Sequence, residues 1–279
     1  NTALRRWTKR RCQLLLDTER CLFDTALIQT GVAEFTWYFN QHHLVTDAWS
    51  FDLIYRYVSQ FYVGLSSNIA VDSVPLPAYA SYLAYEKSQR VSEAVTYRQQ
   101  KSHAEILPSR LYGAVAATAS TRTERMTLHV GRDRSDRLRT LAQLPDVRSL
   151  TPDLSIYNIF ATLLFAYLKR VSDECRFCIE TPAHNRPTRT YRETIGLFIE
   201  MFPLQATIEQ DETFLSLLRK VQLETTTVLR YAQPGASDAN ALRSCNTVLN
   251  YITASFGDFC GHPMQSEWLH AGHGDPGNH

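Results

Sequence analysis

The chain has 279 residues, of which 44% are hydrophobic and 20% charged, and its 29 basic and 28 acidic side chains leave a formal net charge of +1. This is the composition of an ordinary globular protein with one large or two modest domains, and the balanced charge argues against nucleic-acid and membrane-surface partners. No apolar run approaches the ~20 residues that a membrane-spanning helix needs.

Hydrophobic periodicity predicts helices and strands along most of the chain. In the first half we expect a strand over 33–41, a helix over Trp49–Tyr62, a loop over 64–78 and a helix over Tyr79–Lys101. A small polar segment over 108–123 is predicted to link two lobes. The second half is expected to contain strands over Arg125–Val130, Cys175–Pro182, Glu200–Glu209 and Thr247–Thr253, with helices over Ser135–Leu144, Asp153–Leu168 and Thr213–Tyr231. Interleaved helices and strands indicate a layered α/β protein.

The six cysteines are scattered through the chain, which favours reduced thiols in a cytoplasmic protein over a disulfide framework. Cys175 and Cys178 spell CxxC, but residues three apart in a strand point to opposite faces, and there is no second CxxC. A second group, His262, His270, His273 and Asp275, has no matching ligand cluster elsewhere. We therefore predict no metal site.

The strand over 33–41 runs into a segment with two adjacent histidines, His42 and His43, followed by Asp47. A strand that ends in such a turn can aim an imidazole into a cleft, where it can exchange protons near neutral pH. Because neighbouring residues of a strand face opposite ways, only one of the two histidines is expected in the cleft. We predict that His42 faces the interior and hydrogen-bonds to the backbone.

This spacing resembles the HHxxxDG signature of the acyltransferase superfamily that includes chloramphenicol acetyltransferase and the condensation domains of nonribosomal peptide synthetases; Ala48 replaces the final glycine. Three later segments resemble condensation domains in the same order. They are the strand-then-arginine segment 178–186, the run 195–204, which is similar to IGxFVNTLPL, and the Asn-Tyr strand 246–251. Trp49-Ser50 is similar to peptide-forming condensation domains, and does not fit epimerization or cyclization domains.

The resemblance implies an α/β fold of two chloramphenicol-acetyltransferase-like lobes in a V, with a tunnel between them. Only 41 residues precede the first histidine, and the chain stops soon after the Asn-Tyr strand, so we expect a fold truncated at both ends. Residues 1–110 are predicted to be part of the N-terminal lobe, which carries the HHxxxD motif, and residues 111–279 part of the C-terminal lobe.

The implied activity is that of an acyltransferase of secondary-metabolite biosynthesis, forming an amide bond between two carrier-bound thioesters. The implied partners are donor and acceptor peptidyl carrier protein domains and a neighbouring adenylation domain of the same polypeptide, in the cytoplasm. No cofactor is expected to be bound tightly, since the substrates arrive on 4'-phosphopantetheine arms.

By the same resemblance, His43 is the catalytic residue, acting as a base or as a positioning group. Asp47 is expected to point away from the cleft and to pair with Arg186, because burying either charge alone is costly. Together with His42, these two residues are predicted to support the site.

Three further residues are candidates for the tunnel wall: Ala48, Trp49 and Glu200. Ala48 either distorts a turn that needs a positive φ or narrows the tunnel by one methyl group. Glu200 stands where the family commonly has asparagine. If it faces the tunnel, it could bind a cationic substrate or raise the pKa of His43; if it faces solvent, it does nothing.

Two other functions remain open. The first is a stand-alone acyltransferase that uses acyl-coenzyme A or an acyl carrier protein to acylate an alcohol or an amine. The second is a catalytically silent docking domain of a synthetase. Ala48 and Glu200, which depart from the family pattern, suggest this alternative.

Overall fold

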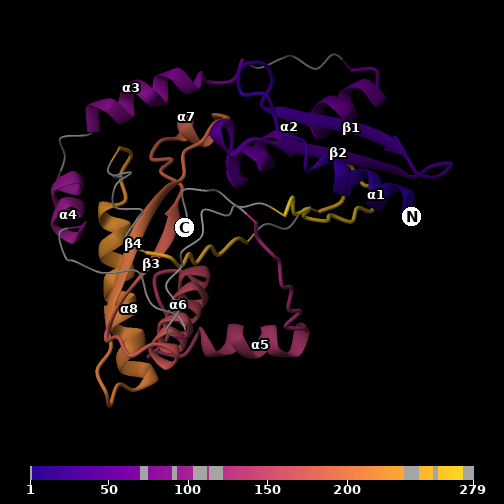
Figure 1. Cartoon of the computed structure of the whole chain (residues 1–279). Helices are drawn as coiled ribbons and strands as arrows, with labels where there is room; N and C mark the ends of the chain where they lie inside the picture. Colours follow the sequence, from indigo (N-terminus) through magenta and orange to yellow (C-terminus); the bar gives the residue numbers. More distant parts are fainter. Residues whose placement is uncertain are drawn as a thin grey trace.

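The structure is a computed structural model that describes residues 2–69, 75–89, 93–102, 112, 122–235, 245–253 and 257–272. Its first half contains α1 (Thr2–Arg11), β1 (Phe23–Gln29), β2 (Phe35–Gln41), the 3-10 turn η1 (His43–Val45), α2 (Ala48–Ser66), α3 (Tyr79–Gln89) and α4 (Glu93–Ser102). Its second half contains α5 (Arg132–Leu141), α6 (Pro152–Val171), β3 (Arg176–Ala183), α7 (Arg189–Arg192), β4 (Glu200–Thr207) and α8 (Phe214–Tyr231). The two antiparallel hairpins, β1–β2 and β3–β4, lie apart in the molecule (Figure 1).

Helices cover both faces of the first hairpin. Adjacent residues of β2 face opposite ways, and the ring of Tyr38 meets Trp7 of α1 at 5.1 Å while that of Phe39 meets Phe51 of α2 at 5.9 Å. Arg11, at the end of α1, adds a 2.6 Å ion pair with Asp24 of β1. These contacts fix the orientation of β2, the strand that precedes the two histidines.

The main hydrophobic core lies in the second half, where α6 and α8 pack with the β3–β4 hairpin (Figure 1). Phe165, Phe177, Leu204 and Val221 are fully buried there. Helix α6 is long and apolar enough by composition to cross a membrane, but in this fold it is a core helix that packs on α8 and β3. Helix α4 joins the same core through Ala94.

Two predicted strands are wrong. Residues 125–130 form no strand, and Met126 and Leu128 are largely exposed, so the alternating pattern has no sheet to join among the described residues. Residues 247–253 make one parallel bridge, between Val248 and Glu180, because the segment follows the free edge of β3 only briefly.

The predicted helix over 79–101 is two helices, α3 and α4, and most of the predicted linker 108–123 lies outside the described residues.

The expectation of reduced thiols is wrong for one pair of cysteines. Cys178 of β3, which is 3% exposed, forms a disulfide with Cys245, at a Cα–Cα distance of 5.4 Å. This bond joins β3 to the segment that bridges its free edge. Cys12, Cys21 and Cys175, with Cys260, are free.

We expect Cys245→Ser to lower the free energy of unfolding by about 2–4 kcal/mol, because the disulfide closes a long loop between residues 67 positions apart. Denaturant melts with and without a thiol reductant measure this effect. Cys21→Ser, at an exposed free thiol, is the control and should leave stability unchanged. A wild-type protein equally stable with and without reductant would contradict the assignment.

Candidate functional site

The chain leaves β2 at His42, which holds the turn through two hydrogen bonds. Its backbone N–H donates to the carbonyl of Leu22 at 2.7 Å, and its ring Nδ1 accepts the N–H of Leu44 at 3.1 Å. The predicted backbone hydrogen bond of His42 is therefore present, although it comes from a 3-10 turn, whereas the prediction assumed strand alternation. The turn therefore gives the two histidines different surroundings.

His43 begins this 3-10 turn and is exposed. Among the described residues none hydrogen-bonds to its ring, so both ring nitrogens are open to an incoming group. The next two residues, Leu44 and Val45, are also exposed, at 59% and 39%. An imidazole beside apolar side chains can meet a substrate without first breaking a contact within the protein.

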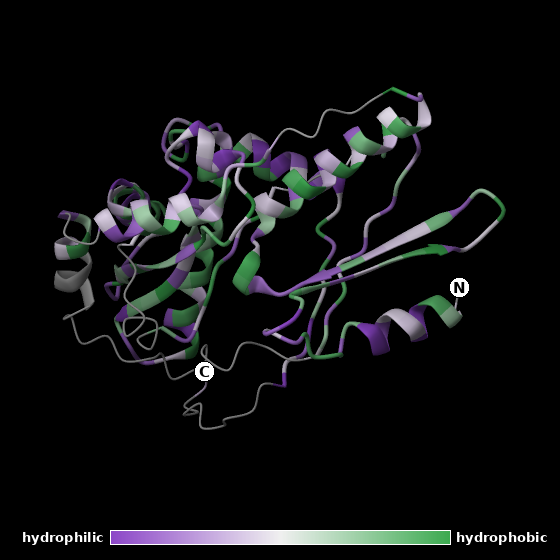
Figure 2. Ribbon diagram, turned by 90° about the horizontal axis from the view of Figure 1, so that it is seen from above, coloured by the Kyte–Doolittle hydropathy of each residue, from purple (hydrophilic) through white to green (hydrophobic). Residues whose placement is uncertain are grey.

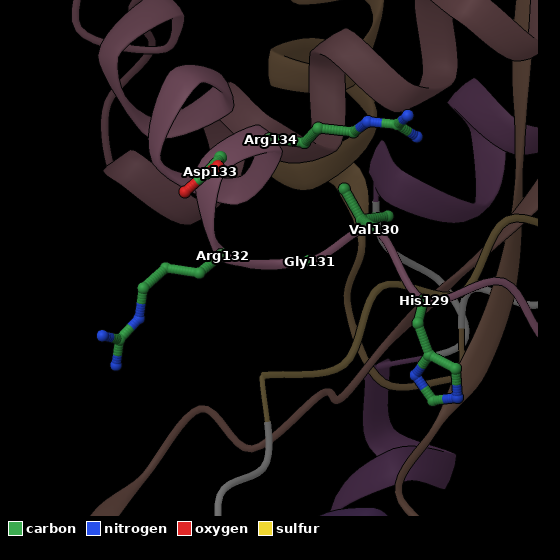
Figure 3. A pocket seen from close by; sticks show the side chains of 6 residues that line it. All are labelled: His129, Val130, Gly131, Arg132, Asp133 and Arg134. Atoms are coloured by element: carbon green, nitrogen blue, oxygen red, sulfur yellow. The ribbon is translucent and has the colours of Figure 1, made fainter.

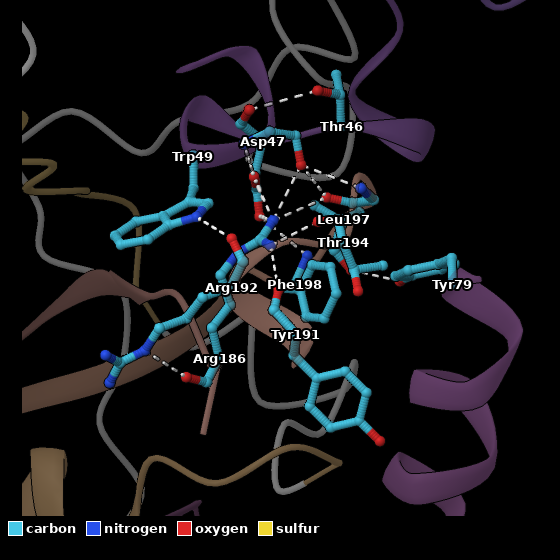
Figure 4. Close-up of polar contacts among 12 residues, drawn as sticks. Thr46, Asp47, Trp49, Tyr79, Arg186, Tyr191, Arg192, Thr194, Leu197 and Phe198 are labelled. Carbon is cyan, nitrogen blue, oxygen red and sulfur yellow. Dashed lines mark hydrogen bonds and ion pairs between the residues drawn. The ribbon is translucent and has the colours of Figure 1, made fainter. Parts of the chain in front are cut away.

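Asp47 is buried and caps the start of α2. Its Oδ1 accepts the N–H of Ser50 at 2.8 Å and its Oδ2 accepts the N–H of Phe198 at 3.1 Å (Figure 4). The guanidinium of Arg186 donates to both oxygens, at 2.9 and 3.0 Å. The pairing that the resemblance implies is thus present, and it connects the histidine segment to the residues after β3.

Arg186 is buried with its partner, at side-chain exposures of 2% and 0%. Its Nη1 donates to the carbonyls of Tyr191 and Thr194, at 2.6 and 2.7 Å. Burial lowers the pKa of Arg186, and the charge of Asp47 opposes that shift. A buried guanidinium that donates through Nη2 to both carboxylate oxygens and through Nη1 to two carbonyls is an arrangement in which an internal ion pair can be tolerated.

Ser50 and Gly196 lie beside this pair, and Nη2 of Arg186 also donates to the hydroxyl of Ser50 at 2.9 Å. The hydroxyl of Ser50 donates to the Gly196 carbonyl at 2.8 Å and accepts its N–H at 3.0 Å. A Cβ at position 196 would lie 2.2 Å from the ring of Tyr79, so only glycine fits there. Sequence reasoning did not predict this contact, although the glycine of the Ile195-Gly196 segment was a usable signal.

Trp49 is 40% exposed, and its indole N–H donates to the carbonyl of Arg192 at 2.8 Å. Its ring meets that of His184 edge to face at 5.7 Å. Although His184 is exposed on one side, loss of water around its ring lowers its pKa, and Asp47 opposes that shift. No feature of the sequence singled out His184. A tunnel-wall role for Trp49 stays a prediction.

Ala48 is the first residue of α2 and is exposed. Its φ is not in the positive range that favours glycine. Alanine is unstrained at this first helical position, and the alternative in which it distorts the family's turn stays a prediction. The alternative in which its methyl group narrows the tunnel stays a prediction.

Glu200 begins β4 and is half-buried, opposite Ala183 in the register. One of its carboxylate oxygens accepts hydrogen bonds from the Asn185 amide at 2.9 Å and from the Gly235 N–H at 2.8 Å. A carboxylate held by these two donors is not an idle surface group, and a tunnel-facing role for Glu200 stays a prediction. Within the described residues, no three histidine, cysteine or acidic side chains gather as metal ligands; His273 and Asp275 lie outside that part.

The family model named "Condensation domain" matches residues 2–241, which is most of the chain. The chain belongs to the condensation-domain family. Curated relatives of this condensation domain include a linear gramicidin synthase of Brevibacillus parabrevis, 28% identical over 211 residues, and malpinin synthetase of Mortierella alpina, 27% identical over 236 residues. The matches cover 72% and 82% of this chain but only 4% and 3% of those proteins.

Solved structures agree on the fold. The first condensation domain of the CDA synthetase matches with a TM-score of 0.71 at 21% identity, over 84% of this chain and 52% of that one. A starter condensation domain of rhizomide synthetase, in complex with C8-CoA, matches with a TM-score of 0.73 at 20% identity, over 89% and 57%. The chain therefore has the fold of this family and spans about half the length of these solved domains.

Proposed function

We propose that this condensation domain forms an amide bond between two carrier-bound thioesters in nonribosomal peptide synthesis. The observation that carries the proposal is the exposed imidazole of His43, on a turn that is held in place from both sides. His42 braces the turn before it, and the buried Asp47–Arg186 pair fixes the start of α2 after it. Membership of the condensation-domain family supports the same proposal.

The reaction needs a neutral amine, which is not protonated to the ammonium form, and an activated acyl group. The amine nitrogen attacks the thioester carbonyl, the C–N bond forms, the C–S bond breaks, and the amine proton ends on the departing thiol. His43 either takes that proton or orients the amine for attack. An imidazole whose ring nitrogens make no hydrogen bond to any described residue is suited to both roles.

The proposed partners are donor and acceptor peptidyl carrier domains, each bringing its substrate on a phosphopantetheine arm, with an adenylation domain in the same cytoplasmic polypeptide. The curated relatives are peptide synthetases, in which this chain's counterpart is a small part, and this context favours carrier-borne over free substrates. His43, Ala48 and Trp49 are the residues we assign to the substrate path.

The test is a reconstituted reaction of the full-length polypeptide with separately loaded donor and acceptor carrier domains. An amide product on the acceptor carrier, detected by intact-protein mass spectrometry, is the expected result. A parallel reaction supplies acyl-coenzyme A and a free amine or alcohol. Product only in that reaction would favour the stand-alone acyltransferase, and product in neither would favour a silent docking domain.

We expect Ala48→Gly to raise the condensation rate or to widen acceptor tolerance, by an amount equivalent to about 1–3 kcal/mol if the methyl group crowds the amine. Ala84→Gly, at an exposed position of α3, is the control for the loss of helix propensity and should leave the rate unchanged. Identical rate and substrate range in Ala48→Gly would remove the crowding argument.

A further inference from the structure

Helix α1 carries an unusual concentration of positive charge. Its ten residues include Arg5, Arg6, Lys9, Arg10 and Arg11, and none is acidic. The whole chain has a net charge of only +1, so the remainder of the chain is net acidic. Such a local excess is a feature of this helix and not of the general composition.

Folding accounts for only part of this charge. Arg11 pairs with Asp24, and Lys9 and Arg10 lie in the last turn, where cations favour the helix dipole. Arg5 and Arg6 have neither benefit. Each lies four residues before another cation, a spacing at which like charges destabilise a helix.

The remaining cations face solvent. Side chains Arg5, Arg6, Lys9 and Arg10 are exposed, and no carboxylate in the described part of the chain pairs with them. On the other side of the helix, Leu4 and Trp7 are half-buried, and Trp7 packs on Tyr38 of β2. Because its apolar side is already taken by the hairpin, α1 cannot lay that side into a lipid surface as a free amphipathic helix does.

The last turn of α1 lies near the strand end that leads to the histidine turn. Arg11 binds Asp24, and Asp24 is opposite Asn40 in the hairpin register, two residues before His42. Figures 1 and 2 both show α1 alongside the β1–β2 hairpin. The last turn of α1, with Lys9 and Arg10 beside Arg11, therefore lies nearest the end of β2 that leads to His43, and its first half runs along the hairpin past Tyr38.

We propose that the cationic side of α1, formed by Arg5, Arg6, Lys9 and Arg10, docks an acidic face of the carrier domain that delivers a thioester to His43. The proposal rests on the proposed function and adds the place and the chemistry of the contact. Clustered carboxylates on the partner would neutralise the four cations. Such complementary charge speeds association and makes it sensitive to salt.

Helix α5 provides a matched control, since it also has ten residues and four arginines. Its cations alternate with Asp133 and Asp136, and Arg139 pairs with Asp136 at 2.6 Å. Figure 3 shows a shallow surface pocket at its start, where Arg132 and Arg134 point to opposite sides and form no common face. The two helices are alike in length and arginine content but not in clustered charge.

The experiment compares R5E/R6E with R132E/R134E in the full-length polypeptide. Both double variants change the charge by the same amount in the first half of an exposed ten-residue helix. Glutamate near the N-terminus of a helix interacts favourably with the helix dipole. Each is assayed with substrate on its carrier domain and with the same acyl or aminoacyl group as a small pantetheine thioester. The carrier domains are added separately, as donor and as acceptor.

We expect R5E/R6E to raise KM for one carrier-borne substrate by about 10-fold or more at low salt, with the effect shrinking as salt is added. Turnover of the pantetheine thioesters and the behaviour of R132E/R134E should match wild type. R5Q/R6Q should give a smaller shift in the same direction, and it replaces R5E/R6E if that variant folds poorly.

An unchanged KM for both carriers, an equal effect of R132E/R134E, or a loss of pantetheine-thioester turnover would each overturn the docking proposal. Failure of the proposed function looks different. In that case, wild type forms no amide from either form of substrate, whatever the state of α1.

Discussion

Replacing His43 with alanine is expected to lower the rate of amide formation by roughly 10²–10⁴-fold, the usual contribution of a general acid–base group. The physical reason is that the attacking amine loses the group that accepts its proton or holds it in line. The measurement is single-turnover transfer between pre-loaded carrier domains. Loading of the carriers, which does not involve this imidazole, should stay at the wild-type rate.

Because of the position of His43, a loss of activity in His43→Ala can be separated from a loss of stability. Its side chain is exposed and makes no hydrogen bond to any described residue, so its removal should leave the melting temperature unchanged. His42→Ala is the matched variant, because it removes the neighbouring ring and its bond to the Leu44 N–H. A smaller loss is expected there, through a looser turn. Near-wild-type condensation by His43→Ala would leave His43 without a role in the reaction.

Much of the candidate site was predictable because its signals are local. The alternating residues of β2 and the apolar stripe of α2 predict a strand, a turn and a helix without reference to the rest of the chain. The Asp47–Arg186 contact joins residues 139 positions apart, and only the family resemblance connected them. No property of either residue alone selects the other.

The failed predictions all concern contacts between distant segments. Whether residues 125–130 and 247–253 become strands depends on a free sheet edge, which periodicity does not report. The Cys178–Cys245 bond depends on the same approach of segment 245–249 to β3. The hydrogen-bond partners of Glu200, Asn185 and Gly235, likewise come from other segments, which its place in the run 195–204 does not reveal.

Removing one partner of the Asp47–Arg186 pair is expected to lower the free energy of unfolding by about 3–5 kcal/mol, because the other charge stays buried and unpaired. Asp47→Ala and Arg186→Ala should both show this loss in denaturant melts. Asp47→Asn keeps the same shape and an oxygen that can cap α2, so any loss it shows reports the charge. The comparison is Asp146→Ala, which breaks an exposed pair with Arg219 and should cost less than about 1 kcal/mol.

The double replacement decides whether the pair acts as a unit. If the single losses come from a stranded charge, Asp47→Ala with Arg186→Ala together should cost clearly less than the sum of the two, since neither charge then remains. The residual loss would come from the other contacts of these side chains, including the N–H of Phe198 and the carbonyls of Tyr191 and Thr194. Additive losses would mean that the two residues stabilise the fold independently. Single variants with wild-type stability would mean that the pair does not hold the histidine segment in place, and the structural role assigned to it would have to be withdrawn.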